Sequence, residues 1–301
     1  MHKRVLVIGS SNTDMVVKTK NFPQPGETVL GGIFLLNPGG KGANQAVAAA
    51  RAGANVCFVT KVGKDIFGKQ ALDGFLKEGL DVSHVTETGE FASGVALITV
   101  NENAENQIVV ASGANMDLKP ADLPDSIFDQ VQFVLLQLEI PLETVKYIVR
   151  KCSEFKIKVI LNPAPAVPLE DDLLSGLYLI TPNETETQIL TGIYPEDPDS
   201  LQKAGRIFLE KGIKNVIITI GKKGVFLMNE TLSQITPALE VAAIDTTAAG
   251  DVFNGALLTS LSEEKNWIEA CEFACKAAAI SVTRMGAQSS APFRDEINQK
   301  S

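Results

Sequence analysis

The sequence predicts an α/β fold: a doubly wound, mostly parallel sheet with helices on both faces, plus a small β-sheet lid. Two observations predict it, since short apolar runs of strand length recur along the chain and helical patterns separate them. Composition agrees, because 45% of the 301 residues are hydrophobic and only one is tryptophan. We therefore expect right-handed parallel crossovers between successive strands.

The strands are predicted from runs that are apolar at nearly every position, as in strands buried on both faces. In chain order these runs are VLVIG (5–9), VCFVTKVG (56–63), FVLLQLEI (133–140), IKVILNP (157–163), LYLITPN (177–183) and VIITIG (216–221). The helices are predicted from apolar residues that recur at helical spacing. They cover 43–53, 67–79, 141–155, 199–212, 250–264 and 267–284.

Two segments break this alternation of strands and helices. Residues 15–37 and 91–110 contain short strand patterns joined by turns rich in Pro and Gly or in Asn and Glu. Both are too short for helical crossovers, so we expect them to form a small separate sheet. We expect one domain over residues 1–301, with this sheet as a lid over the site and as the surface of a homodimer.

Charge, cysteine content and hydropathy exclude several classes of protein. The net charge of −9 argues against a nucleic-acid partner and an anionic membrane partner, because phosphate groups attract basic surfaces. The four cysteines and two histidines do not form a Cys/His metal pattern. No run reaches the roughly 18 apolar residues of a membrane span. We expect a cytoplasmic protein.

The segment GGKGAN at 39–44 is close to two phosphate-binding patterns and fits neither. A Walker A loop needs a glycine where Leu35 stands, and it needs Ser or Thr after its lysine. A dinucleotide fingerprint fails because GSSNTD, after the first strand, lacks the later glycines. The functional reading is a tight turn that brings backbone N–H groups, Lys41 and Asn44 against a polyhydroxyl ligand. The alternative is a surface turn before an ordinary helix.

Polar side chains also follow the predicted strands, where open α/β sheets bind ligands. Asn12 and Asp14 follow the first strand, and Glu139 closes the run 133–140. A lone carboxylate at such a place fits a solvated strand end. Three polar groups at strand ends instead indicate a ligand site.

Two later segments, TPNETE (181–186) and TIGKKG (219–224), also follow strands. Asn183 and Glu186 are three residues apart at a predicted helix start, which is typical of a helix cap. The same pair fits a water-mediated Mg²⁺ site, and the two roles are compatible. The second segment is typical of a hairpin turn and also fits a nucleotide channel. Its residues nearest that channel are Thr219, Gly221 and Gly224.

The segment DTTAAGD (245–251) combines two acids with small residues before a predicted helix. A helix that begins near 248–250 offers unpaired N–H groups and a positive dipole end, so small side chains there form an anion hole. Asp251, in the first turn, is placed to accept a proton from a hydroxyl that attacks phosphorus. Asp245 is better placed to hold the loop or a cation. The alternative makes Asp251 a surface acid that complements the helix dipole.

These segments, in this order, resemble the ribokinase branch of the phosphofructokinase-B family of carbohydrate kinases. The resemblance rests on GGKGANQAVAAARAGA, NPAPA, ITPNETE and DTTAAGDVFNGA. It runs from GSSNTD to GAQSSAP, nearly the whole chain, and its last two motifs are the most specific. NTD together with GGKGAN favours the ribokinase branch over its relatives.

The resemblance implies a β-lidded kinase, commonly dimeric, that transfers the γ-phosphoryl group of ATP to O5 of D-ribose. The implied catalytic set is the base Asp251 with the anion-hole residues Ala248, Ala249 and Gly250. The implied ribose-binding residues are Asn12, Asp14, Gly40, Lys41, Asn44, Glu139 and Asp251. The implied ATP-binding residues are Asn183, Thr219, Gly221, Lys222, Gly224, Gly250 and Cys275.

The resemblance also implies two metal ions. Asn183 and Glu186 would serve the Mg²⁺ that accompanies ATP. A monovalent activator, usually K⁺, would lie beside the anion hole, held largely by backbone carbonyls. The residues implied around it are Asp245, Thr247, Ser281, Arg284, Gly286 and Ser290. One departure is Cys275, which stands where related chains can carry a histidine near the adenine.

Other functions stay open at this point. The acceptor could be deoxyribose, fructose, a phosphosugar or a nucleoside. A phosphosugar would need more basic residues than Lys41, and a nucleoside would need stacking aromatic side chains. A non-enzymatic, sugar-responsive regulator on the same scaffold is a further alternative, against which the intact Asp251 argues.

Overall fold

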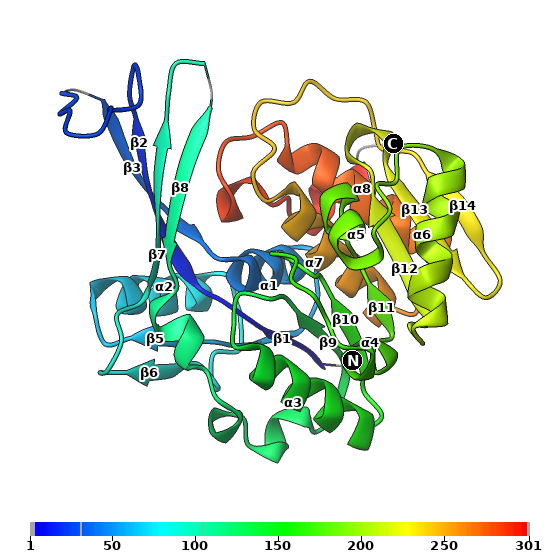
Figure 1. Ribbon diagram of the computed structural model, residues 1–301. Helices are drawn as coiled ribbons and strands as arrows, with labels where there is room; N and C mark the ends of the chain where they lie inside the picture. Colours follow the sequence, from blue (N-terminus) through cyan, green and yellow to red (C-terminus); the bar gives the residue numbers. More distant parts are fainter. Residues whose placement is uncertain (1–3, 31, 104, 300–301) are drawn as a thin grey trace.

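The main feature of the fold is an eight-stranded sheet between two layers of helices (Figure 1). The computed structural model describes residues 4–30, 32–103 and 105–299. In sheet order the strands are β14 (Ser233–Thr236), β13 (Val225–Asn229), β12 (Asn215–Thr219), β11 (Leu179–Ile180), β10 (Lys158–Leu161), β9 (Val131–Leu136), β1 (Arg4–Ile8) and β4 (Val56–Val59). Neighbours are parallel except at β12–β13 and β13–β14. The predicted α/β fold with a mostly parallel sheet is confirmed.

Helices cover both faces because successive side chains of each strand point to opposite sides. The helices are α1 (Lys41–Arg51), α2 (Ile66–Lys77), α3 (Leu142–Glu154), α4 (Asp171–Ser175), α5 (Glu184–Thr191), α6 (Pro198–Glu210), α7 (Ala249–Ser262), α8 (Trp267–Ser281) and α9 (Arg294–Gln299). On β1, Val5 and Val7 join the apolar cluster of α1, α7 and α8. Leu6 and Ile8 join the cluster of α3, α4 and α6 on the other face. Among the described helices, none has the length and apolarity to span a bilayer.

The structure differs from the predicted elements in three respects. The run 56–63 divides into β4 and β5 (Lys61–Gly63), because β5 leaves the main sheet and pairs with β6 (Thr86–Thr88). The run 133–140 stops being a strand where β9 ends, so Glu139 lies in the following connection. The sequence patterns miss α4 and α9, which are too short for apolar periodicity to reveal them. The helix start predicted at Asn183 is the start of α5.

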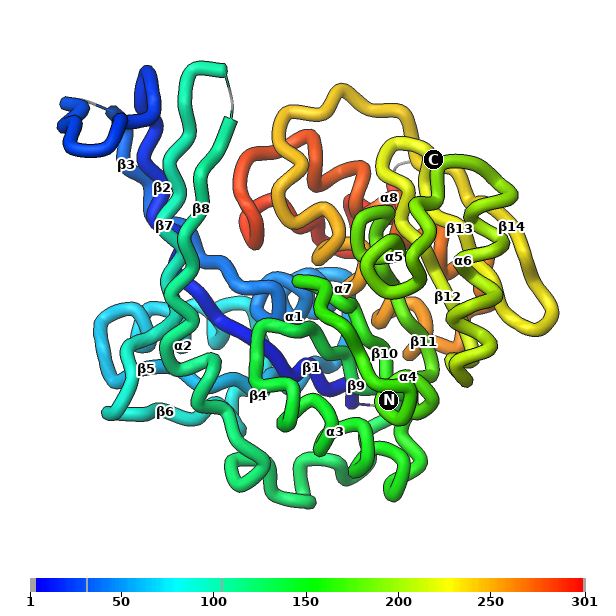
Figure 2. Tube along the Cα trace, viewed as in Figure 1, coloured from blue at the N-terminus to red at the C-terminus, as the bar shows by residue number. Residues whose placement is uncertain are grey.

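A second sheet of four strands projects from the main body (Figure 2). Its strand order is β3 (Ile33–Gly39), β2 (Asn12–Lys18), β7 (Gly94–Val100) and β8 (Asn106–Ala111). Gly31 and Ala104, within the segments expected to form the lid, lie outside the described residues. Because β2 begins shortly after β1 ends, the chain passes from the main sheet directly into the second sheet.

Candidate active site

The predicted sugar-site residues gather at the carboxyl ends of β1 and β9. The chain leaves β1 toward β4 on one side and leaves β9 toward β10 on the other. This is the topological switch point, where open α/β sheets bind ligands. Residues 10–12 follow β1, and residues 137–139 follow β9.

The turn before α1 is packed so closely that it requires glycine. Gly40 precedes α1 with a φ of 88°, a conformation that favours glycine. A side chain on Gly42 would come within 2.5 Å of the backbone nitrogen of Ser10. The start of α1 therefore rests directly on the backbone that follows β1.

Glu139 connects this turn to the end of β9. Its Oε2 accepts hydrogen bonds from the Ser10 hydroxyl at 2.5 Å and from the Lys41 N–H at 3.0 Å. The carboxylate thus joins the two loops that border the switch point. The sequence predicted Glu139 as a ligand-site residue, and its hydrogen bonds to the two loops are a further role that the sequence pattern did not show.

Five charged side chains face one another around the switch point. They are Asp14, Lys41, Glu139, Glu186 and Asp251. Burial, together with the charges of Glu139 and Asp251, raises the pKa of Asp14 from 3.8 to about 6. Burial alone would lower the pKa of Lys41, but the carboxylates around it outweigh burial and raise that pKa. The cluster has more acids than bases, which suits it to bind groups that donate hydrogen bonds.

Asp251 lies in the first turn of α7 and is 6% exposed. Its Oδ2 accepts a hydrogen bond from Asn44 Nδ2 and its Oδ1 one from Gln45 Nε2, both at 2.9 Å. Burial raises the pKa of Asp251, whereas the charge of Lys41 and the two amide donors oppose that rise. The structure thus excludes the alternative in which Asp251 is a surface acid. Asn44 Oδ1 is buried without a hydrogen-bond partner among the described residues.

The helix end beside Asp251 has an open N-terminus. Ala248 has a φ of 59°, in the left-handed region, and no side chain caps α7. The Ala249 N–H donates to the Thr246 carbonyl at 3.3 Å. The other N–H groups of a first helical turn have no partner within the helix, so they are available to an anion. Asn254 holds the turn from behind, because its Nδ2 donates to the Gly250 carbonyl at 2.8 Å.

Two further residues that hold the sugar site were not among the predicted site residues. Asn115 is 1% exposed and donates from Nδ2 to Asn12 Oδ1 at 2.7 Å. Its Oδ1 accepts the Ser11 N–H at 2.8 Å, so Asn115 fixes the start of β2. Gln45, the second, contacts Asp251 as described above.

The predicted Mg²⁺ pair forms a capping box at the start of α5. Asn183 Oδ1 accepts the Glu186 N–H at 2.8 Å, and Glu186 Oε2 accepts the Asn183 N–H at 2.9 Å. The cap is therefore observed, while Glu186 also faces Lys41 and Asp251, and burial raises its pKa. The Thr219 N–H bonds the Pro182 carbonyl at 2.9 Å, which brings the predicted nucleotide turn beside α5.

Glycines shape that nucleotide turn, in agreement with a hairpin between β12 and β13. Gly221 and Gly224 have φ values of 54° and 105°. Lys222 lies between them in a short 3-10 helix, Gly221–Lys223. Cys275, by contrast, is a buried residue of α8, and burial raises the pKa of its thiol to about 12. A neutral buried thiol offers little to an adenine edge.

Asp245 holds the loop in which the monovalent cation was expected. Its Oδ1 accepts from the N–H of Thr247 at 2.9 Å and from its hydroxyl at 2.6 Å, and its Oδ2 accepts the Gly286 N–H at 2.9 Å. The Arg284 guanidinium is paired with Glu296. The hydroxyls of Ser281 and Ser290 donate to carbonyls three residues earlier. Side chains thus shape this loop.

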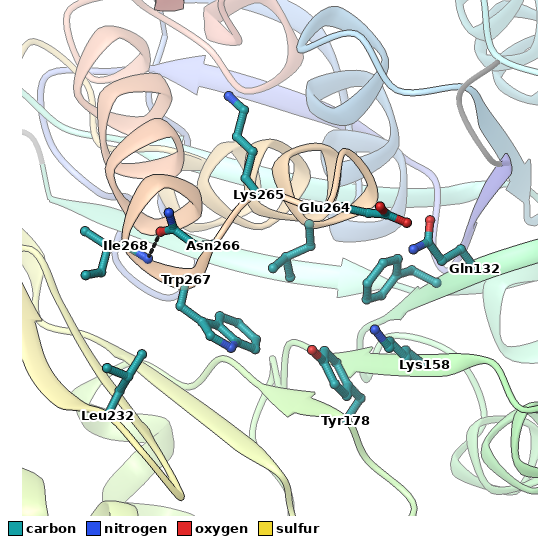
Figure 3. Close-up of a pocket in the computed structure, with 11 residues that line it drawn as sticks. Gln132, Lys158, Tyr178, Leu232, Glu264, Lys265, Asn266, Trp267 and Ile268 are labelled. Atoms are coloured by element: carbon teal, nitrogen blue, oxygen red, sulfur yellow. Dashed lines mark hydrogen bonds between the residues drawn. The ribbon is translucent and has the colours of Figure 1, made fainter.

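A cavity of about 510 Å³ lies apart from these residues (Figure 3). It is lined by side chains such as Phe133, Lys158, Tyr178 and Trp267 at the amino ends of β9 and β10. None of the predicted site residues lines it. The convergent charges needed to stabilise a developing charge lie in the charged cluster and not in this cavity.

A buried acid beside a lysine and an uncapped helix end, at a sheet switch point, fits phosphoryl transfer to a hydroxyl acceptor. Residues 2–294 match the family described as pfkB family carbohydrate kinase, and the chain belongs to this family.

Named relatives agree with this assignment. The chain is 47% identical to a ribokinase of Haemophilus influenzae over 98% of this chain and 97% of that protein. It is 38% identical to a deoxyribokinase of Salmonella typhi over the same shares. Solved structures of ribokinases from Thermotoga maritima (40% identity, TM-score 0.90, 98% of both chains) and from Arabidopsis thaliana complexed with ribose and ATP (29% identity, TM-score 0.93, 99% of this chain and 98% of that one) share the fold.

Proposed function

We propose that the protein transfers the γ-phosphoryl group of ATP to O5 of D-ribose, producing D-ribose 5-phosphate and ADP. The observation that carries the proposal is the buried Asp251 carboxylate beside the uncapped end of α7 and facing Lys41. The choice of sugar is supported by the ribokinases at 39–47% identity that match nearly the whole chain. It is supported also by the similar ribokinase complexed with ribose and ATP.

In the proposed reaction, Asp251 accepts the proton of the ribose O5 hydroxyl as that oxygen attacks the γ-phosphorus. The new O5–P bond forms while the bond from the γ-phosphorus to the bridging oxygen breaks, and ADP leaves with the bond electrons. The N–H groups at residues 248–250 and the Lys41 ammonium stabilise the charge that develops on the transferring group. Positioning and electrostatics thus account for the catalysis.

The sugar-binding proposal is supported by unused acceptors around Asp251. Asn44 Oδ1 is buried and has no hydrogen-bond partner among the described residues. Buried acceptors are normally hydrogen-bonded, so a ligand hydroxyl would satisfy this one. Asp14 and Glu139 add carboxylate acceptors in the same cluster. A polyol supplies many hydroxyl donors, so it satisfies these groups without bringing a further charge.

Mg²⁺ would accompany ATP and neutralise charge on its phosphates. No group of three or more His, Cys, Asp or Glu side chains in the described ranges is arranged to hold a metal ion. The donor set fits Mg²⁺ bound mainly by phosphates and water, with Glu186 contacting it through water. One Glu186 oxygen is used in the capping box, which leaves Oε1 for this contact.

For K⁺, we propose a site in the loop that Asp245 holds, formed with Thr247, Ser281, Arg284, Gly286 and Ser290. The hydrogen bonds of Asp245 to Thr247 and Gly286 bring the two halves of this loop together. Bound there, K⁺ would favour the conformation of the loop that leads into the anion hole.

A cytoplasmic location stays a prediction.

We propose further that the second sheet forms a homodimer interface. Its register makes both faces apolar, because neighbouring cross-strand rows point to opposite sides. One row contains Leu36, Met15, Leu97 and Val109, and the next contains Leu35, Val16, Ile98 and Ile108. Asp14 shares the face of the second row, so the first row faces away from the site. Leu97 and Val109 are 52% and 67% exposed, and such a surface favours burial against a second copy.

Sedimentation equilibrium tests the dimer. The double variant Leu97→Lys with Val109→Lys is expected to sediment as a monomer, whereas Glu102→Lys, on an exposed turn beyond the apolar rows, is expected to keep the assembly of the parent. A parent protein that sediments as a monomer at high concentration contradicts the interface.

A coupled assay of ADP release tests the reaction and the acceptor together. D-ribose, 2-deoxyribose, fructose and a nucleoside are compared at equal concentrations, with a sample that lacks sugar. We expect the highest kcat/KM with D-ribose and negligible ADP release without an acceptor. Because one similar protein is a deoxyribokinase, preference for 2-deoxyribose is the main alternative, and the panel separates the two.

A further inference from the structure

A chain of buried amides lies behind Asp251. Gln45 is fully buried on α1 and donates from Nε2 to Asp251 Oδ1 and to Asn162 Oδ1, both at 2.9 Å. Its Oε1 accepts from Gln137 Nε2 at 2.6 Å. Every polar atom of the Gln45 side chain therefore has a partner, and the chain joins α1 to the ends of β9 and β10.

The direction of these hydrogen bonds is fixed by a backbone carbonyl. Asn162 Nδ2 donates to the Thr181 carbonyl at 3.1 Å, and a carbonyl can only accept. Asn162 must therefore turn its oxygen toward Gln45, which in turn presents its NH₂ group to both Asn162 and Asp251. Gln137 supplies the complementary donor to Gln45 Oε1. The amide of Gln45 cannot flip without breaking three hydrogen bonds.

Thr181 anchors the anion hole as well as this chain. Its hydroxyl donates to Asn254 Oδ1 at 2.6 Å, and Asn254 Nδ2 donates to the Gly250 carbonyl at 2.8 Å. The carbonyl of Thr181, just after β11, is connected to Asp251 through Asn162 and Gln45. Its hydroxyl is connected to the start of α7 through Asn254. The base and the anion hole are fixed relative to each other by the same buried network.

We propose that Gln45 is the positioning residue that holds Asp251 as an oriented, ionised base, with its amide direction set by Asn162 and Thr181. The inference rests on the proposed role of Asp251 as the base. In this scheme Gln45 acts through Asp251, and none of its own atoms belongs to a bond that forms or breaks. Its donor ties down one carboxylate oxygen while Asn44 ties down the other.

The charges around Asp251 make the Gln45 donor important for the ionisation of this carboxylate. The charged groups that face Asp251 are Lys41 on α1, Asp14 on β2, Glu139 after β9 and Glu186 on α5. Three of these four are acids, and together with burial they disfavour the ionised form of Asp251. Lys41 and the two amide donors are what oppose them. Loss of the Gln45 donor is therefore expected to raise the pKa of the base.

The test is the pH dependence of kcat with saturating ribose and ATP in Gln45→Met, which keeps the side-chain volume and removes the donor. The acidic limb of the profile is expected to move to higher pH by about one to two units, because a buried hydrogen bond to a carboxylate stabilises its ionised form by that order. On that limb kcat falls by about 10- to 100-fold, and it recovers partly at high pH. A profile that overlays the parent profile, even in a destabilised variant, overturns the proposal.

Two further variants isolate the role of Gln45. Gln132→Met makes the same exchange at the opposite end of β9, where Gln132 borders the cavity of Figure 3 and its Oε1 has no hydrogen-bond partner among the described residues. This control is expected to keep the parent profile. If Gln45→Met does not fold, Asn162→Ala, which leaves Gln45 in place but frees its amide, is expected to move the limb in the same direction. An unmoved limb in Asn162→Ala contradicts the proposal.

Failure of this inference is distinguishable from failure of the proposed function. If Asp251→Asn turns over like the parent, Asp251 is not the base and the whole scheme fails. If Asp251→Asn is impaired while Gln45→Met keeps the parent profile, only the role of Gln45 fails.

Discussion

The raised pKa of Asp14 leads to a prediction in which stability and function oppose each other. The pKa rises from 3.8 to about 6 because the carboxyl is largely buried and lies near Glu139 and Asp251. The folded protein therefore holds the Asp14 proton more tightly than the unfolded chain does. The ionised form costs stability at high pH, and this cost disappears as pH falls below the unfolded value.

The magnitude follows from the two pKa values. At 1.36 kcal/mol for each unit of pKa, the difference between 3.8 and about 6 corresponds to about 3 kcal/mol at pH 8 and about 1 kcal/mol at pH 4.5. Asp14→Asn removes the charge and keeps the shape. We expect the ligand-free variant to be more stable than the parent by these amounts, while its KM for ribose rises because an anionic acceptor is lost.

Urea denaturation of the ligand-free proteins at pH 8 and pH 4.5 measures the effect. Asp73→Asn, an exposed acid on α2, is the matched control and is expected to change the free energy of unfolding by less than about 0.5 kcal/mol at either pH. An Asp14→Asn variant that is no more stable than the parent at pH 8 refutes the reasoning. A gain that is the same at both pH values also refutes it, because the cost would then not come from ionisation.

Three further predictions concern the surroundings of the site. Asn115→Ala removes the hydrogen bonds to Ser11 and Asn12, so we expect the free energy of unfolding to fall by about 2–4 kcal/mol. We also expect the KM for ribose to rise by a larger factor than kcat falls. An unchanged KM would contradict the role of Asn115. Gly42→Ala places a methyl group within 2.5 Å of the Ser10 nitrogen, and we expect a clear fall in Tm, whereas Gly74→Ala, with open space at its site, should leave Tm unchanged or raised. Adding K⁺ to an assay that contains only Na⁺ should raise kcat, and a flat response would remove the cation site in the Asp245 loop.

The fold was largely predictable because the strands are buried on both faces. Nearly continuous apolar runs such as 5–9 and 216–221 permit few environments other than the centre of a covered sheet. Helix limits were less certain, since α1 begins at Lys41, directly after the glycine turn, and not at residue 43 as its apolar pattern indicates. The division of 56–63 into two strands depends on pairing with β6, a long-range contact that no local pattern encodes.

The site was predictable where chemistry needs unusual residues side by side. An acid among small residues, as at Asp251, and a lysine after two glycines, as at Lys41, are unusual in an ordinary surface segment. The structure brings both side chains into one charged cluster. Gln45 and Asn115 could not be identified in this way. Each is a single polar residue whose importance depends on partners about 100 or more positions away.

Turnover of Asp251→Asn in the presence of D-ribose and ATP tests the central claim most directly, with ribose binding measured in parallel by calorimetry. The account predicts that kcat falls by about 10² to 10⁴-fold while ribose affinity changes little, because the amide keeps the shape of the carboxylate but cannot accept the proton. Near-normal turnover in this variant would contradict the assignment of Asp251 as the base.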